Sequence, residues 1–79
     1  MTVNLRYFAA LADQAGVPRE TVETQATSLG NLYDEVRVRR ALRLERAWVR
    51  VAVNDEFVSW DRAVRDGDQI AFMPPVSGG

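Results

Sequence analysis

Apolar and polar side chains alternate near both ends of the chain, and this period of two predicts a half-buried β-strand in each stretch. The two stretches are residues 2–8 and 69–73. Their inward-facing positions are Val3, Leu5, Tyr7, Ile70 and Phe72. Pro74 ends the second strand, because proline donates no backbone N–H to a ladder.

Three further strands are indicated by the same alternation and by turn residues. We expect an exposed strand over residues 19–26, a strongly apolar strand over residues 48–53 and a short returning strand at residues 57–58. Residues 54–55 supply the turn between the last two, and residues 66–68 supply a turn before the final strand. The inward positions of the first two are Val22, Thr24, Val49, Val51 and Val53.

Two helices are predicted between the strands. Residues 9–15 are rich in Ala and Leu and predict a short helix that Gly16 closes. A longer helix begins after Thr27 or Ser28, either of which can cap it, and ends within residues 38–44. Its apolar stripe, at the spacing i, i+3, i+4 and i+7, consists of Leu29, Leu32, Tyr33 and Val36.

These elements predict one α+β domain over residues 1–73, followed by an extended, flexible tail over residues 74–79. One amphipathic helix packed on one face of a sheet of four to five strands is the economical arrangement. Val64 is predicted to be a buried plug in the irregular segment 61–65. The predicted core consists of Val3, Leu5, Leu29, Leu32, Val36, Val49, Val51, Val53, Ile70 and Phe72.

The composition narrows the function classes. The 79 residues carry a net charge of −1 and include neither Cys nor His. We therefore expect no disulfide, no metal site, no bound cofactor and no autonomous enzyme, because the usual nucleophile and acid–base side chains are missing. The charge balance gives no reason to expect nucleic acid. Without a long apolar run or a secretory signal, we expect no membrane association and a cytoplasmic location.

Six of the ten arginines lie between Arg37 and Arg50. Such a cluster is typical of a solvated helix end, where the helix dipole favours cations. The alternative is a site for phosphates, nucleic acid or an acidic partner, whose affinity would fall steeply with salt. The spacing also predicts weak surface pairs of Asp34 with Arg37 and of Glu35 with Arg39.

Three apolar side chains are predicted to face outward. By parity Phe8 and Met73 fall on the polar side of their strands, and Phe57 lies beside a turn. Single exposed apolar residues are common in soluble proteins. If these three gather on the open face of the sheet, they mark a site for a protein partner.

The last six residues, Pro74-Pro75-Val76-Ser77-Gly78-Gly79, predict a thin tail that leads away from the sheet. Two prolines favour a polyproline-like course, and the two glycines carry no side chains. Fully extended, six residues reach roughly 20 Å, which is far enough to enter a narrow pocket of another protein. The Gly79 carboxylate is then the reactive group that the tail presents; the alternative is an idle terminus.

Three stretches carry a family pattern: Val51-Ala52-Val53-Asn54, Val58-Ser59-Trp60-Asp61 and Asp66-Gly67-Asp68-Gln69-Ile70-Ala71-Phe72-Met73-Pro74-Pro75-Val76-Ser77-Gly78-Gly79. The opening Leu5-Arg6-Tyr7-Phe8-Ala9, followed by Leu11 and Gly16, fits the same pattern. Together they resemble the small subunit of molybdopterin synthase, the MoaD branch of the ubiquitin-like ThiS/MoaD sulfur carriers. The resemblance covers nearly the whole chain and is most specific from Val51 onward.

The resemblance implies a ubiquitin-like β-grasp fold with a mixed sheet. It implies that an ATP-dependent adenylating enzyme joins AMP to the Gly79 carboxylate, and that a sulfur donor then displaces AMP to leave a thiocarboxylate. The carrier would dock on the large subunit of molybdopterin synthase, insert its tail and give sulfur to the pterin precursor for the dithiolene of molybdopterin. Catalytic side chains would belong to the partners.

The resemblance also assigns residues. Gly78 and Gly79 form the reacting end, because glycine lets a backbone approach an active site closely. The partner-binding residues are Phe8, Phe57, Met73, Pro74, Pro75, Val76 and Ser77. Two alternatives stay open: a sulfur carrier of another pathway, such as thiazole (thiamin) synthesis or protein modification, and a protein-binding ubiquitin-like module with an idle tail.

Overall fold

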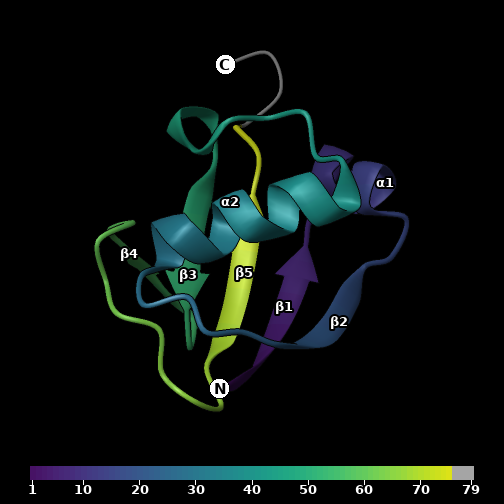
Figure 1. Ribbon diagram of the computed structural model, residues 1–79. Helices are drawn as coiled ribbons and strands as arrows, with labels where there is room; N and C mark the ends of the chain where they lie inside the picture. Colours follow the sequence, from purple (N-terminus) through teal and green to yellow (C-terminus); the bar gives the residue numbers. More distant parts are fainter. Residues whose placement is uncertain (76–79) are drawn as a thin grey trace.

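A mixed five-stranded sheet with one long helix across one face makes up the computed structural model, which describes residues 1–75 (Figure 1). The strands are β1 (Thr2–Tyr7), β2 (Arg19–Glu23), β3 (Arg50–Val53), β4 (Glu56–Val58) and β5 (Gln69–Met73). The helices are α1 (Ala10–Ala15), α2 (Leu29–Arg40) and the 3₁₀-helix η1 (Arg46–Trp48). Within this part of the chain, no helix has the length and apolar character that a membrane span requires.

The strand order across the sheet is β2-β1-β5-β3-β4. β1 and β5 are parallel neighbours, whereas the other three pairs are antiparallel. Two parallel neighbours cannot be joined by a tight turn, and the long connection from β1 to β5 includes α2, which lies across the sheet (Figure 1). The predicted α+β arrangement is confirmed. The sheet has five strands, where four to five were expected.

Two predicted helix signals are confirmed: the cap at the start of α2 and the glycine that closes α1. The Oγ atom of Ser28 accepts a hydrogen bond from the backbone N–H of Asn31 at 3.2 Å, so Ser28 caps α2. Ala41 follows α2 with a φ of 56°, and the N–H of Leu42 donates to the carbonyl of Arg37 at 2.9 Å. Gly16 closes α1 with a φ of 80°, a conformation that glycine adopts without a Cβ penalty.

All ten residues predicted for the core are buried. The predicted inward residues Val22, Thr24 and Val64 are buried as well. Alternation did not indicate Leu11 and Leu42, which complete the core from α1 and from the loop after α2. It also missed Trp60, whose ring centroid lies 5.3 Å from that of Tyr33 and 6.1 Å from that of Phe72.

The expected strand over residues 48–53 is too long at its start. Trp48 lies in η1 and is 64% exposed, and the strand begins at Arg50. The N–H of Trp48 donates to the carbonyl of Glu45 at 2.9 Å, and the N–H of Val49 donates to that of Arg46 at 3.1 Å. These turn bonds remove residues 46–48 from the ladder, which a count of apolar positions does not reveal. The expected strands at 2–8 and 19–26 also end earlier, at Tyr7 and Glu23.

The two predicted surface pairs on α2 are wrong. In the described residues, Asp34 instead lies 3.6 Å from the Nη2 atom of Arg46, and Arg39 pairs with Glu20. The Glu35 carboxylate accepts a hydrogen bond from the hydroxyl of Thr24 at 3.2 Å. Tertiary partners outcompete neighbours one turn away, because isolated pairs along a helix stabilise it by only about 0.2–0.5 kcal/mol.

Glu20 on β2 is the centre of a polar network that ties the sheet to α2. Its carboxylate accepts two hydrogen bonds from the guanidinium of Arg40, at 3.0 and 2.7 Å, and one from Arg39 at 3.2 Å. The hydroxyl of Tyr7 on β1 donates to the same carboxylate at 2.5 Å. The bonds from Arg40 are the main reason that the pKa of Glu20 falls from 4.5 to about 2, and burial is the main reason that the pKa of Tyr7 rises.

Asp68 is a second buried carboxylate, and it shapes the turn that leads into β5. It accepts hydrogen bonds from the Nη1 atom of Arg62 at 2.8 Å and from the backbone N–H of Arg65 at 2.9 Å. Burial alone would raise the pKa of Asp68, but these bonds outweigh it and lower the pKa. The bonds to Asp68 thus help to set where β5 begins.

Replacing Glu20 with Gln should lower the free energy of unfolding at pH 7 by about 2 kcal/mol, because the variant loses a carboxylate that its folded surroundings keep ionised. The folded pKa of about 2 lies below the ordinary 4.5, so the contribution is complete above pH 4.5 and is lost as the pH falls toward 2. Denaturant unfolding across this pH range measures the difference between wild type and variant. The exposed carboxylate of Glu56 offers a matched control, and an equal loss in Glu56→Gln would contradict this assignment.

Candidate functional site

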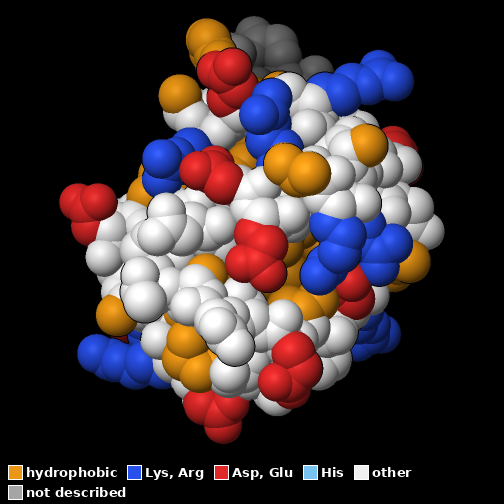
Figure 2. Space-filling model, in the orientation of Figure 1, with side chains coloured by type: hydrophobic (Ala, Val, Ile, Leu, Met, Phe, Trp, Pro, Cys, Tyr) orange, Lys and Arg blue, Asp and Glu red, His pale blue; other side chains and the backbone are white. Residues whose placement is uncertain are grey.

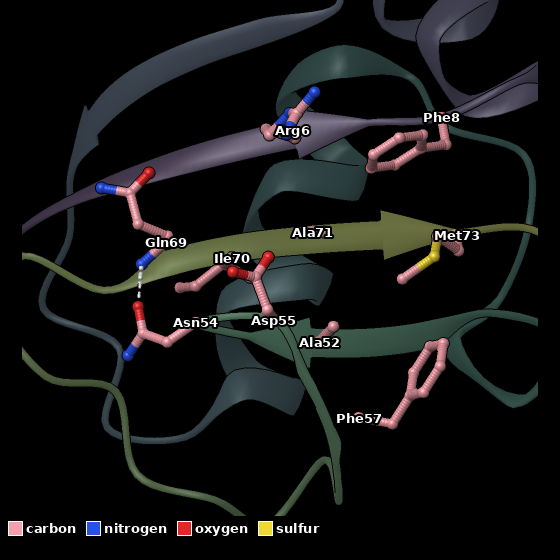
Figure 3. A pocket seen from close by; sticks show the side chains of 10 residues that line it. All are labelled: Arg6, Phe8, Ala52, Asn54, Asp55, Phe57, Gln69, Ile70, Ala71 and Met73. Atoms are coloured by element: carbon pink, nitrogen blue, oxygen red, sulfur yellow. Dashed lines mark hydrogen bonds between the residues drawn. The ribbon is translucent and has the colours of Figure 1, made fainter.

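A row of four residues crosses the sheet on the face that α2 leaves open. Arg6 on β1 lies opposite Ala71 on β5, Ala71 lies opposite Ala52 on β3, and Ala52 lies opposite Phe57 on β4. Side chains at paired positions point to the same side of a sheet. Because the two central members are alanines, a hollow of about 520 Å³ opens above the middle of the sheet (Figure 3).

The three outward apolar residues predicted from parity meet at one end of this hollow. Figure 3 shows Phe8, Phe57 and Met73 around its apolar end. Phe8 is 37% exposed and Phe57 is 55% exposed, whereas Met73 is half-buried. Their clustering on the open face, which was the condition for a partner site, is therefore confirmed.

The backbone after β1 sets the direction of Phe8. Its N–H donates to the carbonyl of Phe72 at 3.2 Å, which continues the contact with β5 beyond the end of β1. The next residue, Ala9, has a φ of 50° and a ψ of −126°, a conformation that costs energy for any residue with a Cβ. This sharp change of direction at Ala9 ends β1 and leaves the Phe8 ring on the open face.

The opposite end of the hollow is polar and was missed by the sequence analysis. It is lined by Asn54, Asp55 and Gln69, with Arg6 on one side (Figure 3). Asn54 exchanges two hydrogen bonds with Gln69: its Oδ1 accepts from the N–H at 3.1 Å, and its N–H donates to the carbonyl at 2.8 Å. Asn54 and Asp55 were predicted only as a turn, and both have positive φ angles of 52° and 72°.

Two arginines lie against the aromatic rim of the hollow. The Cζ atom of Arg6 lies 5.2 Å from the centroid of the Phe8 ring, and that of Arg50 lies 3.8 Å from the centroid of the Phe57 ring. Both distances are within the range of cation–π attraction. The rim therefore combines apolar rings with fixed positive charges.

A second apolar hollow lies where the chain leaves β5. Seven residues line it: Phe8, Ala9, Ala10, Leu44, Met73, Pro74 and Pro75. The carbonyl of Leu44 accepts a hydrogen bond from the hydroxyl of Tyr33 at 2.6 Å, and this bond anchors the loop after α2 beside the tail. Phe8 and Met73 belong to both hollows, so an apolar path runs from the open face of the sheet to Pro75.

The structure describes two of the six predicted tail residues. Pro74 is half-buried and Pro75 is exposed, and both follow the end of β5 without regular secondary structure. The predicted partner-binding residues Val76 and Ser77, and the predicted reacting residues Gly78 and Gly79, lie outside the described residues. In residues 1–75, no group of three or more His, Cys, Asp or Glu side chains is arranged to hold a metal ion.

The arginine cluster between Arg37 and Arg50 is partly neutralised within the chain. Arg39 and Arg40 pair with Glu20, and Arg46 pairs with Asp34. Figure 2 views the molecule from the side of α2 and shows acidic side chains interspersed among the basic ones. This face is a mixed surface, as the solvated helix end predicts, and the pairing weakens the case for a phosphate site there.

The chain is similar to known proteins over nearly its whole length. The ThiS family model matches residues 5–79. A protein of Mycobacterium tuberculosis named molybdopterin synthase sulfur carrier subunit is 39% identical over 80 residues, which cover 98% of this chain and 96% of the relative.

Solved structures of similar proteins share the fold. A putative molybdopterin converting factor, subunit 1, from Pyrococcus furiosus has a TM-score of 0.80 and 30% identity, over 96% of this chain and 99% of that one. A protein–protein complex of subunits 1 and 2 of the molybdopterin-converting factor from Helicobacter pylori contains a chain with a TM-score of 0.70 and 25% identity, over 100% of both chains. The implied ubiquitin-like β-grasp fold is confirmed.

Loss of an aromatic side chain should lower the free energy of unfolding much less at the exposed rim than in the buried core. Phe57→Ala should change the free energy of unfolding by less than about 1 kcal/mol, because the ring is already 55% exposed. Phe72→Ala, on the same sheet but fully buried, should cost about 3–5 kcal/mol. Urea unfolding of both variants makes the comparison, and equal losses would mean that Phe57 belongs to the core and not to an exposed site.

Proposed function

The chain belongs to the ThiS family, as its sequence resemblance implied, and we propose that it acts as the sulfur carrier subunit of molybdopterin synthase. One structural observation supports this role above the others: the hollow on the open sheet face and the hollow at the base of the tail, beside Pro74 and Pro75, share Phe8 and Met73. A partner that covers this face is thereby placed beside the start of the segment that carries Gly79.

The proposed chemistry takes place at the carboxylate of Gly79. A carboxylate is a poor electrophile, so one of its oxygens first attacks the α-phosphate of ATP, and pyrophosphate leaves. A sulfur nucleophile of the hydrosulfide class then adds to the acyl carbon, and AMP leaves with the former carboxylate oxygen. The product is a thiocarboxylate, in which one sulfur atom has replaced one oxygen atom and no redox change has occurred at carbon.

The side chains of this protein supply little of that chemistry. With no Cys and no His in its sequence, the chain offers neither a thiol that could carry sulfur nor an imidazole that could move protons. We therefore assign the catalytic side chains to the adenylating enzyme and to the large subunit of the synthase. Gly78 and Gly79 have no Cβ atoms, so the end of the tail can enter a narrow active site. The consumption of ATP fits the cytoplasm as the proposed location.

Docking on the large subunit is assigned to the open face. In this proposal Phe8, Phe57 and Met73 pack against the partner, and an apolar side chain of the partner fills the hollow above Ala52 and Ala71. The complex of subunits 1 and 2 in Helicobacter pylori shows that a similar chain assembles with a second subunit. Pro74 and Pro75 would then direct Val76, Ser77 and the glycines into the partner's active site.

The two alternatives make different predictions. A carrier for thiazole synthesis or protein modification would form the same thiocarboxylate but would not bind the large subunit of molybdopterin synthase. A binding module with an idle tail would keep its partner-dependent function after removal of Gly78 and Gly79.

Incubation with ATP, the adenylating enzyme and a sulfur donor should convert the chain to its thiocarboxylate. Intact-protein mass spectrometry should then detect the exchange of one oxygen atom for one sulfur atom. Removal of Gly79 should abolish the exchange while the circular dichroism spectrum and thermal unfolding stay unchanged, because the buried core consists of residues between Val3 and Phe72. An unmodified wild-type chain in the presence of active adenylating enzyme would refute the proposed role.

Ala71→Leu should weaken binding to the large subunit by about tenfold or more, because the added side chain fills the hollow that the partner is expected to occupy. Isothermal titration calorimetry measures the dissociation constant. Ala63→Leu is a matched control, since Ala63 is exposed and does not line the hollow. Equal affinities of the two variants would remove the hollow from the interface.

A further inference from the structure

Three arginines lie on the open face between the middle of the sheet and the end where the tail begins. Arg6 on β1 lies directly opposite Arg19 on β2, and Arg50 on β3 lies opposite Met73. All three are exposed. None of them forms an ion pair with another of the residues 1–75.

The arrangement of these arginines works against the stability of the free protein. Like charges at directly opposed positions of an antiparallel pair repel each other, and Arg6 faces Arg19 in this way. Glu20 follows Arg19 directly in the sequence, but its carboxylate points to the other side of the sheet, where Arg39 and Arg40 bind it. On the helix side, Glu20 thus neutralises Arg39 and Arg40, whereas no carboxylate of residues 1–75 pairs with Arg6, Arg19 or Arg50 on the open face.

Two of the three guanidinium groups are held in place by aromatic rings. Arg50 lies 3.8 Å above the ring of Phe57, and Arg6 lies 5.2 Å from the ring of Phe8. A guanidinium group can lie over a ring and still use the N–H groups along its edge as donors. Such an edge matches the two oxygens of a carboxylate in a bidentate hydrogen-bonded pair.

The negative charges of the open face lie elsewhere. Asp55 lines the hollow beside Asn54 and Gln69, at the polar end shown in Figure 3. Glu23 lies at the other end of β2 from Arg19, where it accepts a hydrogen bond from the hydroxyl of Thr2. The open face is therefore positive near the tail and negative away from it, so it can distinguish two orientations of a docked partner.

We propose that Arg6, Arg19 and Arg50 pair with carboxylate side chains on the docking face of the large subunit, around the apolar side chain that fills the hollow. This inference rests on the proposed function and adds the chemistry of the partner. It requires a docking face with an apolar centre and acidic residues on the side nearest the tail. The charge pattern orients the carrier so that its tail meets the active site.

Charge variants test the inference against the purified large subunit. Arg19→Glu should raise the stability of the free carrier, because it replaces a like-charge pair with an attractive one, and should weaken binding about tenfold. Arg6→Gln and Arg50→Gln should each slow association by about fivefold and reduce its dependence on salt. Arg65→Gln, an exposed arginine in the turn before β5, should bind within about twofold of wild type. Stopped-flow association and thermal unfolding supply the two readouts.

The outcomes separate the inference from the function on which it rests. If the three open-face variants bind like Arg65→Gln while Ala71→Leu still weakens binding, the charge pairing is wrong and the docking site stands. If the wild-type carrier does not bind the large subunit at all, both proposals fail. If single-stranded oligonucleotides bind with the same dependence on Arg6, Arg19 and Arg50 and the large subunit does not, the face recognises nucleic acid and the inference is overturned.

Discussion

One helix can cover only one face of a five-stranded sheet, and this limit shapes the rest of the molecule. The positions that seal the core beneath α2 include Val51 and Phe72, and the positions next to them, Ala52 and Ala71, necessarily face the other way. Because Ala52 and Ala71 have small side chains, the open face is hollow in its middle. The same register builds the core and the candidate docking site, so a slip by one residue would destroy both.

Much of the fold could be predicted because the signals are local. Alternation locates the strands, Ser28 marks the start of α2, and the parity of strand positions places Phe8 and Met73 on the open face. Other features depend on contacts between distant segments. The pairing of Glu20 with Arg40 spans 20 residues, and a helical pattern cannot indicate it. Trp48 was placed in the strand because it is apolar and adjoins Val49, and only the hydrogen bonds of η1 show that it lies in a turn.

The two faces of the sheet use charge in opposite ways. On the helix side, the carboxylate of Glu20 accepts hydrogen bonds from three side chains and holds β1, β2 and α2 together. The partly buried guanidinium group of Arg40 is stabilised by its ion pair with Glu20 within the folded chain. On the open face, Arg6 and Arg19 face each other at a small cost to stability. A cost of this kind is expected where a surface is suited to a partner, because the free protein then lacks the groups that would complete it.

The proposed role also limits how tightly the open face can bind. A carrier that collects sulfur at one enzyme and delivers it at another must leave the first before it reaches the second, so a very large apolar interface would trap it. The hollow above the middle of the sheet has a small apolar part, bordered by the exposed rings of Phe8 and Phe57, and a polar opposite end. Charged contacts at its rim can speed association without an equal gain in residence time, because electrostatic steering acts mainly on the encounter rate. A small hollow rimmed by arginines therefore suits a protein whose reactive end has to be passed between partners.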